Sequence, residues 1–521
     1  MLLLMFVPSG KKHIRMKTKI IILLTLLSMC FSCSKDFLEV EKRGLIAQED
    51  FYQTDDEALQ AIAAIYDILQ MNYSSVWHSG WFLKTLPGDE VNGGGGNAGD
   101  QPQIQALSSF EYTPSNDVIY QFFRRCYFGI YRANVLLENV EGDTDAKKIA
   151  LAEAKALRAF FNFELVTLFG EVPLVNEVIA DATQYAQPAA EISAIWAQIE
   201  TDLNAAIVDL PLKSEYPAAQ KFRFAKGTAQ ALLGKALLYQ EKYAAAAEQF
   251  ADVIESAEYD LAPDFSRVLR ADTEFGTESL LEISFAMDDG QNWGTFDWGD
   301  PRANENNIIW QLCGPRGDGY FEGGNSGLNN GWGFAPATTD IFDAFTQDGV
   351  VDNRRASSVM SEEELIALGG DLRLNGELAY DTEGVVRLKY GTWLDETDVS
   401  NVAELNYGTN IRLIRYADVL LMAAEAYNKS GDDASALIEL NKVRARVNMP
   451  DIDAADDVFE AIVRERQLEL AFEGHRFLDL IRWGKAAEVL GSRGYEAKHR
   501  YFPLPQLELD INPNLEQNPD W

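Results

Sequence analysis

The sequence predicts a mainly α-helical protein, in which about four tetratricopeptide-like helix pairs form a scaffold for a loop-rich, variable ligand-binding insert. Three observations predict this fold. Apolar residues recur at helical spacing in both the N-terminal and C-terminal parts of the chain. Two distant stretches repeat one pattern of small and large residues. Between about 260 and 410 the composition changes and helical periodicity is lost.

The first predicted helix runs from Asp55 to Leu69, because Leu59, Ile62 and Ile65 recur on one helical face. A glycine-rich loop at 92–100 follows this helix. Later helical runs are expected at 118–140, 143–170 and 192–210. Asp143 or Thr144 can cap the helix at 143–170, and Gly170 ends it. Proline at position 211 ends the helix at 192–210.

Two stretches share the spacing of a tetratricopeptide unit. Each has a small residue and a large one on its first helix, then an alanine and a large apolar residue on its second. These positions are Gly234, Leu237, Ala246 and Phe250, and then Ala424, Tyr427, Ala436 and Leu440. The small residue allows two helices to cross closely, while the large one fills the neighbouring groove. The pattern favours a helical array.

The composition divides the chain into a scaffold and an insert. Residues 33–260 and 411–491 are predicted to be mainly helical, and 492–521 to form an extended, proline-rich tail. Residues 261–410 are predicted to be the insert, with long loops and short strands. Within it, 290–333 holds four of the ten tryptophans and a large share of the 38 glycines.

Residues 1–32 have the pattern of a signal peptide. Lys17 and Lys19 form a basic region, and an apolar run from Ile20 to Leu27 follows it. That run is shorter than the roughly 20 apolar residues of a membrane-spanning helix. Met16 opens a better-shaped signal than Met1, which leaves open whether 1–15 is translated.

Cys33 is the predicted lipid anchor. It follows the small residue Ser32, as in a bacterial lipoprotein, whereas Cys30 follows the bulky Met29. Plain cleavage and secretion is the alternative, because the motif is loose. The two remaining cysteines, Cys126 and Cys313, are expected to be buried small hydrophobes, although a bridge between them is left open.

The charge excludes several partners. The chain of 521 residues has 81 acidic and 45 basic side chains, a formal net charge of −36. Nucleic-acid binding requires Lys and Arg clustered on one face, so a nucleic-acid partner is not expected. An anionic membrane surface is disfavoured for the same reason, which leaves the lipid anchor as the only predicted membrane contact.

Six ordered segments resemble the SusD/RagB family of nutrient-binding outer-membrane lipoproteins. They are CSKDFLE (33–39), AEAKALRAFFNFELVTLFGEVPLV (152–175), IWAQIETDLNAAIVDLP (195–211), RYADVLLMAAEAYNKSG (415–431) with LNKVRARV (440–447), RERQLELAFEGHRFLDLIRWG (464–484) and the tail YFPLPQLELDINPNLEQNPDW. The resemblance implies a surface-exposed lipoprotein of the outer membrane that acts as a lid on a TonB-dependent, SusC-like transporter. It implies capture of oligosaccharides, or of peptides in some members.

Aromatic residues are the candidate ligand-binding side chains. An indole ring stacks on the apolar C–H face of a sugar ring, and aromatics among glycines have little helix in which to be buried. We therefore predict an exposed glycan platform, although ordinary packing remains the alternative for each ring. Its members are Trp293, Trp298, Trp310, Tyr320 and Trp332, with Trp77 and Trp81 nearby on the same face.

No catalytic residue, metal site or cofactor is predicted. The ionisable cluster Glu469, Glu473, His475, Arg476, Asp479 and Arg482 is interpreted as a structural ion-pair network with pairs Arg466–Glu469 and Arg476–Asp479. The loop 93–96 lacks the Lys-Ser/Thr of a phosphate-binding loop. Calcium at acidic loops such as Asp288–Asp289 is left open, since no EF-hand spacing occurs.

Four functions therefore compete. The leading hypothesis is non-catalytic capture of a glycan, and the acidity of the chain favours a neutral glycan over a polyanionic one. Peptide capture by the same architecture is the second hypothesis, and a helical-repeat scaffold without a nutrient ligand is the third. An enzyme is the fourth, and it would require two close carboxylates of perturbed pKa in a cleft.

Overall fold

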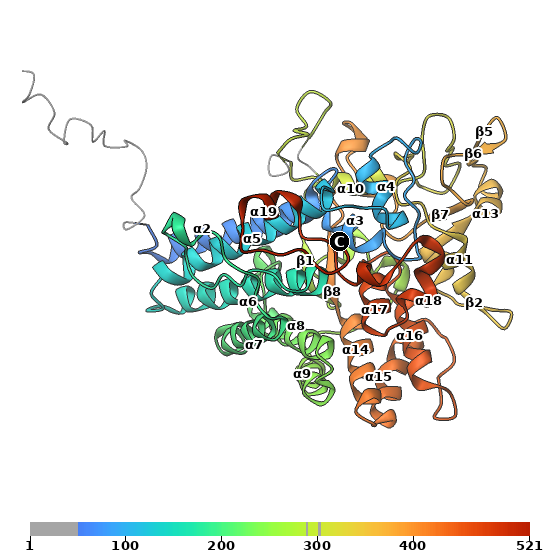
Figure 1. Cartoon of the computed structure of the whole chain (residues 1–521). Helices are drawn as coiled ribbons and strands as arrows, with labels where there is room; N and C mark the ends of the chain where they lie inside the picture. The colour runs from blue at the N-terminus through green and yellow to red at the C-terminus, as the bar shows by residue number, and fades with distance from the viewer. Residues whose placement is uncertain (1–50, 288–289, 301–303) are drawn as a thin grey trace, which may run out of the picture. The chain divides into compact units, whose positions relative to one another are not determined.

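The computed structural model describes residues 51–287, 290–300 and 304–521 (Figure 1). The predictions for the signal peptide, for Cys33 and for calcium at Asp288–Asp289 lie outside the described residues.

Helices make up most of the regular structure. The α-helices are α2 (Asp55–Ser74), α3 (Gly80–Thr85), α4 (Pro102–Ser109), α5 (Asp117–Asn139), α6 (Asp145–Phe169), α7 (Ile192–Asp209), α8 (Lys226–Tyr239), α9 (Tyr243–Glu255), α10 (Ile308–Cys313), α11 (Thr339–Ala344), α12 (Arg355–Ser358), α13 (Glu362–Ala367), α14 (Tyr416–Lys429), α15 (Asp433–Arg446), α16 (Val458–Glu469), α17 (Arg476–Arg482), α18 (Ala486–Leu490) and α19 (Gln506–Ile511). The predicted mainly α-helical class is confirmed.

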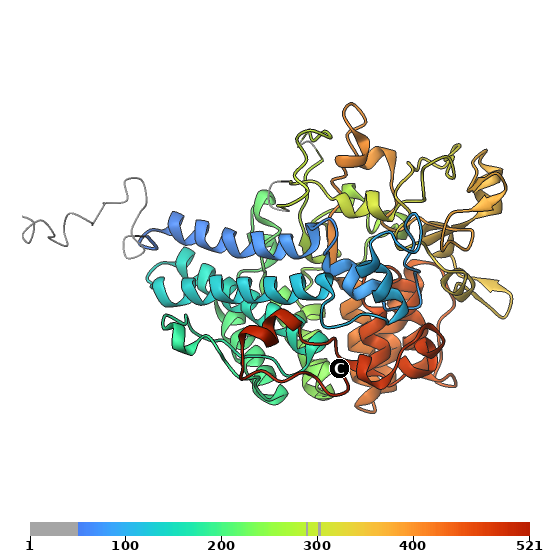
Figure 2. The ribbon, with the colours of Figure 1, turned by 45° about the horizontal axis from the view of Figure 1, so that its top comes forward.

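Consecutive helices pair to form the scaffold. Helix α2 packs on α5, α6 on α7, α8 on α9, and α14 on α15, while α9 also contacts α14. Figure 2 shows α2, α5 and α6 side by side. Thr144 caps α6 by accepting a hydrogen bond from the Lys147 amide, and Gly170 with a φ of 77° ends this helix.

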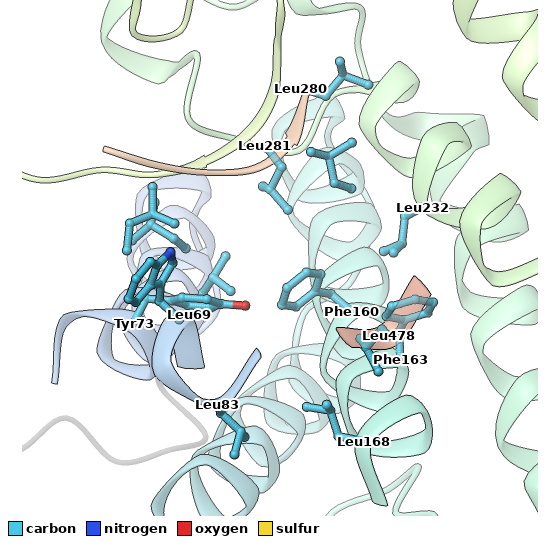
Figure 3. Close-up of a cluster of buried hydrophobic side chains, with 14 of the residues drawn as sticks. Leu69, Tyr73, Leu83, Phe160, Phe163, Leu168, Leu232, Leu280, Leu281 and Leu478 are labelled. Atoms are coloured by element: carbon cyan, nitrogen blue, oxygen red, sulfur yellow. The ribbon is translucent and has the colours of Figure 1, made fainter. Parts of the chain in front are cut away.

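The scaffold has one continuous hydrophobic core. Side chains from α2, α6 and α8, such as Leu69, Phe160 and Leu232, belong to the same buried cluster (Figure 3). The predicted tetratricopeptide positions explain one close contact in it, because a Cβ on Gly234 of α8 would come within 2.6 Å of the Phe250 ring of α9. Glycine at this position therefore allows the two helices to cross closely.

The insert is bounded by one antiparallel strand pair. Strand β1 (Ser279–Ile283) pairs with β8 (Ile411–Arg415), and β8 leads directly into α14. Between them lie three short two-stranded pairs among loops. These are β2 (Thr346–Gln347) with β3 (Val350–Val351), β4 (Val359–Ser361) with β7 (Val385–Arg387), and β5 (Arg373–Leu374) with β6 (Glu377–Leu378).

The C-terminal segment is not extended throughout, which corrects the prediction for 492–521. It contains a 3₁₀ turn at Ala497–Arg500 and the helix α19, which begins after Pro505. The remainder is extended and packs on the scaffold. The side-chain amide of Asn518 donates hydrogen bonds to the backbone carbonyls of Phe169 and Phe502.

The ionisable cluster is a buried network, but the predicted pairs are wrong. Arg466 pairs with Asp418 and Asp479, each at 2.8 Å, and Arg476 pairs with Asp89 at 2.9 Å. Neither arginine pairs with a carboxylate of its own helix, and all three partners lie in other segments. These ion pairs therefore connect separate elements, and the partners Asp418 and Asp89 lie 48 and 387 residues from their arginines.

Cys126 and Cys313 are both buried and free, so no bridge joins them. Burial raises the pKa of both thiols, which fits the prediction that they behave as small hydrophobes.

Candidate functional site

Four tryptophans form a continuous stack, which we call the tryptophan stack: Trp293, Trp298, Trp332 and Trp77, in that order. The ring centroids are 6.3 Å apart in the first pair and 5.9 Å apart in each of the next two. The corresponding interplanar angles are 8°, 18° and 26°.

The stacked rings remain partly uncovered. Carbon atoms in contact lie about 3.5–4.0 Å apart, so nearly parallel rings with centroids 6 Å apart must be offset sideways. Each indole therefore leaves part of its face uncovered by its neighbour. Trp293 and Trp298 are 55% and 40% exposed, whereas Trp332 and Trp77 are partly buried.

The glycine-rich loop positions Trp332 beside Trp77. The Gly95 amide donates to the Gly333 carbonyl at 2.7 Å, and Gly94 forms a β-bridge with Phe334. A Cβ on Gly94 would lie 2.1 Å from the Gly333 carbonyl oxygen, and Gly94 has a φ of +70°. Only glycine fits this close backbone approach without strain. The loop is therefore a structural support for the stack.

Two buried asparagines hold the loop that carries Trp293 and Trp298. Asn406 accepts a hydrogen bond from the Gln291 amide and donates one to the Gln291 carbonyl, both at 2.8 Å. Asn304 accepts from the Asp297 amide at 3.0 Å and donates to the Asp297 carbonyl at 2.7 Å. Each asparagine thus fixes the backbone one or two residues from a stacked tryptophan.

Trp81 and Trp310 were predicted to be exposed members of the platform, and this is wrong. They are 1% and 0% exposed, and they lie on the short helices α3 and α10. Their indole N–H groups donate to the carbonyls of Phe472 and Thr409. Because each polar edge is satisfied inside the protein, both rings can serve as core.

Tyr320 is partly buried. It lines a small cavity of about 40 Å³ together with Arg316 and Thr382. Within the described ranges, no aromatic contact joins Tyr320 to the tryptophan stack. Its predicted role in the platform therefore has no geometric support.

Two aromatic residues at the stack were missed by the sequence analysis. Phe296 lies 4.6 Å from Trp298 between ring centroids, and Phe334 packs edge-on against Trp77 at 5.9 Å. Both are buried, so they anchor Trp298 and Trp77 to the interior of the protein. Their position in the same glycine-rich segment as the tryptophans was an available signal.

Among the residues with described positions, no group of three or more His, Cys, Asp or Glu side chains is arranged to hold a metal ion. In the same part of the chain, every helix is too short or too polar to span a bilayer.

Comparisons with known proteins place the chain among similar sequences and structures. Residues 277–500 match a family model described as the SusD family, and residues 87–238 match one described as starch-binding associating with outer membrane. A SusD-like protein of Formosa agariphila is 27% identical over 550 residues, covering 95% of this chain and 97% of the relative.

Two solved structures are similar over nearly their whole length. A laminarin binding SusD-like protein is 32% identical with a TM-score of 0.80, and the match covers 90% of this chain and 100% of that one. Surface glycan-binding protein A from Bacteroides thetaiotaomicron, in complex with laminarihexaose, is 25% identical with a TM-score of 0.77. That match covers 89% of this chain and 100% of that chain.

Proposed function

Because this chain belongs to the SusD family, we propose that it is a non-catalytic lipoprotein of the cell surface that captures a neutral glycan. We propose further that it hands this glycan to a TonB-dependent, SusC-like transporter in the outer membrane. Cys33 carries the lipid in this proposal.

The tryptophan stack is the observation that carries the proposal. Four indoles in series offer uncovered ring faces over several sugar units, and sugar C–H faces stack on such rings. The rings are held in place before ligand binds. Buried Phe296 and Phe334 pack against them, and the side chains of Asn304 and Asn406 hydrogen-bond the backbone of the loop. Preorganisation of this kind lowers the entropy cost of binding.

A laminarin-type glucan is the ligand class that we propose. Two similar structures are named for laminarin or were solved with laminarihexaose, and laminarin is uncharged. The net charge of −36 would repel a sulfated or uronic polymer from the surface of this protein. The formal charge and the neighbours therefore favour the same neutral ligand.

Isothermal titration of the purified protein against laminarihexaose and a panel of neutral α-glucan, fructan and mannan oligosaccharides tests the proposal. Trp298→Ala removes the ring that contacts both Trp293 and Trp332. A lost ring contact of about 1.4 kcal/mol weakens binding roughly ten-fold. Tyr185→Ala is the matched control, because Tyr185 is 63% exposed and belongs to another segment of the surface.

Unchanged affinity in Trp298→Ala would contradict the role of the stack. Binding of peptides by the parent, with no binding of any glycan, would favour the peptide-capture hypothesis. Product formation from a bound glycan by the pure protein would contradict the non-catalytic assignment.

A further inference from the structure

A cleft lies on α2, and its lining includes none of the tryptophans of the stack. Its volume is about 360 Å³, within the range of pockets that hold small ligands. One wall comes from α2, a second from the segment before α8, and a third from the end of β1 and the residues that follow. Its lining includes Tyr66, Asp67, Gln70, Phe222, Ser284 and Glu305. We call it the α2 cleft.

Two aromatic rings give the α2 cleft a fixed apolar wall. Tyr66 and Phe222 pack edge to face, with ring centroids 5.4 Å apart and an interplanar angle of 83°. The Tyr66 hydroxyl donates to Glu153 at 2.9 Å and accepts from the Phe224 amide at 2.7 Å. Both hydrogen bonds hold the tyrosine ring in one orientation. Phe222 is only partly buried, so some of its surface faces the cleft.

Two of the carboxylates that line the cleft have arginine partners. Asp67 pairs with Arg132 at 3.0 Å, and Glu282 lies 3.5 Å from the Arg412 guanidinium. A carboxylate has several lone pairs, so a paired one can still accept a hydrogen bond from a ligand hydroxyl. Asp67, whose side chain is partly exposed, therefore keeps an acceptor for a hydroxyl of a neutral ligand.

Gln70 and Ser284 contribute polar groups to the cleft, beside the two aromatic rings. The Gln70 side-chain amide donates to the Ser284 carbonyl at 2.8 Å and to Glu305 at 3.2 Å. Ser284 itself is exposed and brings a hydroxyl group to the cleft. An aromatic wall beside hydroxyl, amide and carboxylate groups matches a ring that has apolar faces and a rim of hydroxyls.

We propose that the α2 cleft is a second binding site for a sugar unit of a neutral glycan. The inference rests on the proposed function, because it assigns the same ligand class to a second place on the molecule. Phe222 provides the stacking surface, and Asp67 and Ser284 hydrogen-bond the sugar hydroxyls.

The lining of the α2 cleft includes residues at the base of the loop that carries two members of the tryptophan stack. The Ala286 amide donates to the Glu305 carbonyl at 2.7 Å, which closes the base of the loop that carries Trp293 and Trp298. Gln70 binds residues at both ends of this loop. A short oligosaccharide fills the two sites independently, whereas one long polymer that reaches both gains avidity.

Titration of laminarihexaose and of the same neutral oligosaccharide panel into the parent and four variants tests the inference. The parent should bind two equivalents. Phe222→Ala and Trp298→Ala should each weaken a different one of the two equivalents about ten-fold, and the double variant should weaken both. Ser284→Ala, a substitution at an exposed residue, should weaken only the equivalent that Phe222→Ala weakens. With polymeric laminarin, Phe222→Ala should lose about ten-fold in affinity.

Phe128→Ala, on the exposed face of α5, is the matched control and should titrate like the parent. Circular dichroism confirms that each variant is folded. If Phe222→Ala and Ser284→Ala both titrate like the parent while Trp298→Ala loses binding, the second site is wrong and the proposed function stands. If the parent binds none of the glycans, the proposed function and this inference both fail.

Discussion

Trp81 and Trp332 show how the surroundings of a residue, not its type, decide its role. Both lie near glycines in the sequence, yet Trp81 is 1% exposed and Trp332 belongs to the stack. The difference comes from distant partners. Trp81 donates to Phe472, which is 391 residues away in the chain, whereas Trp332 packs against Trp77 and Trp298 at the surface.

Glu90 carries a pH dependence of stability at the residue scale. It lies at the start of the glycine-rich loop, is 1% exposed and accepts a hydrogen bond from the Phe472 amide. Burial, with a smaller contribution from neighbouring Asp89, raises the pKa of Glu90 from 4.5 to about 8. The folded state therefore keeps the proton between these values, while the unfolded state releases it.

Stability should thus fall as the pH rises from about 4.5 to about 8, because deprotonation favours the unfolded chain in that window. Glu90→Gln cannot ionise and should lose this dependence. The difference in unfolding free energy between variant and parent should grow by about 1 kcal/mol per pH unit. Urea unfolding at a series of pH values measures it.

The exposed residue Glu111 gives a control, because Glu111→Gln should keep the slope of the parent. Equal slopes for the parent and Glu90→Gln would contradict a protonated Glu90 in the folded protein.

At the scale of elements, glycines set how closely segments approach. Gly234 faces the Phe250 ring between α8 and α9, and Gly129 of α5 faces the Phe161 ring of α6, where a Cβ would come within 2.1 Å. In the insert, Gly331 and Gly314 bring two backbones together, and a Cβ on Gly331 would lie 2.4 Å from the Gly314 Cα. Glycine thus allows helices to cross closely in the scaffold, and it allows backbone segments to pack closely in the loops of the insert.

Gly234→Ala should therefore destabilise the protein. Helix propensity alone favours alanine by about 1 kcal/mol, but a methyl group against the fully buried Phe250 costs about 1–3 kcal/mol. The net loss of unfolding free energy should be up to about 2 kcal/mol, measured by denaturant unfolding.

Adding Phe250→Leu to Gly234→Ala should cost less than the sum of the two single substitutions, because the smaller side chain makes room for the methyl group. Gly491→Ala is the control. This glycine has a φ of −59° and nothing within 4 Å of an added Cβ, so the substitution should not destabilise the protein and should stabilise it by up to about 1 kcal/mol. Additive effects of the pair would contradict the close contact.

At the scale of the molecule, buried ion pairs join the scaffold to the insert. Arg415, at the end of β8, pairs with Glu278, Glu469 and Glu473, all of them buried. Lys389 of the insert pairs with the same Glu473 at 2.9 Å. These contacts fix the insert, which carries three of the four stacked tryptophans, to the helical scaffold.

The proposed anchor can be tested on the whole molecule. Cys33→Ala removes the thiol that would carry the lipid, so the protein should leave the membrane fraction and remain folded. Fractionation of cells with immunodetection measures the distribution, and circular dichroism of the released protein checks the fold. Cys30→Ala is the matched control and should stay in the membrane fraction. Retention of Cys33→Ala in the membrane would contradict the anchor.

The sequence by itself determined the helical class, the helix pairs and the segment that holds most of the tryptophan stack. Helical periodicity and the small residues at helix crossings are local properties, so they can be read along the chain. The change of composition after about 260 likewise located Trp293, Trp298 and Trp332 in one segment.

Only the tertiary structure decided which aromatics are exposed and which charges pair. Trp310 is buried because Tyr390 stacks on it at 4.2 Å, and Arg466 pairs with Asp418 and Asp479 in other helices. Such contacts join residues far apart in sequence, so no local pattern encodes them. The α2 cleft depends on them too, because its walls come from α2, the segment before α8 and the end of β1.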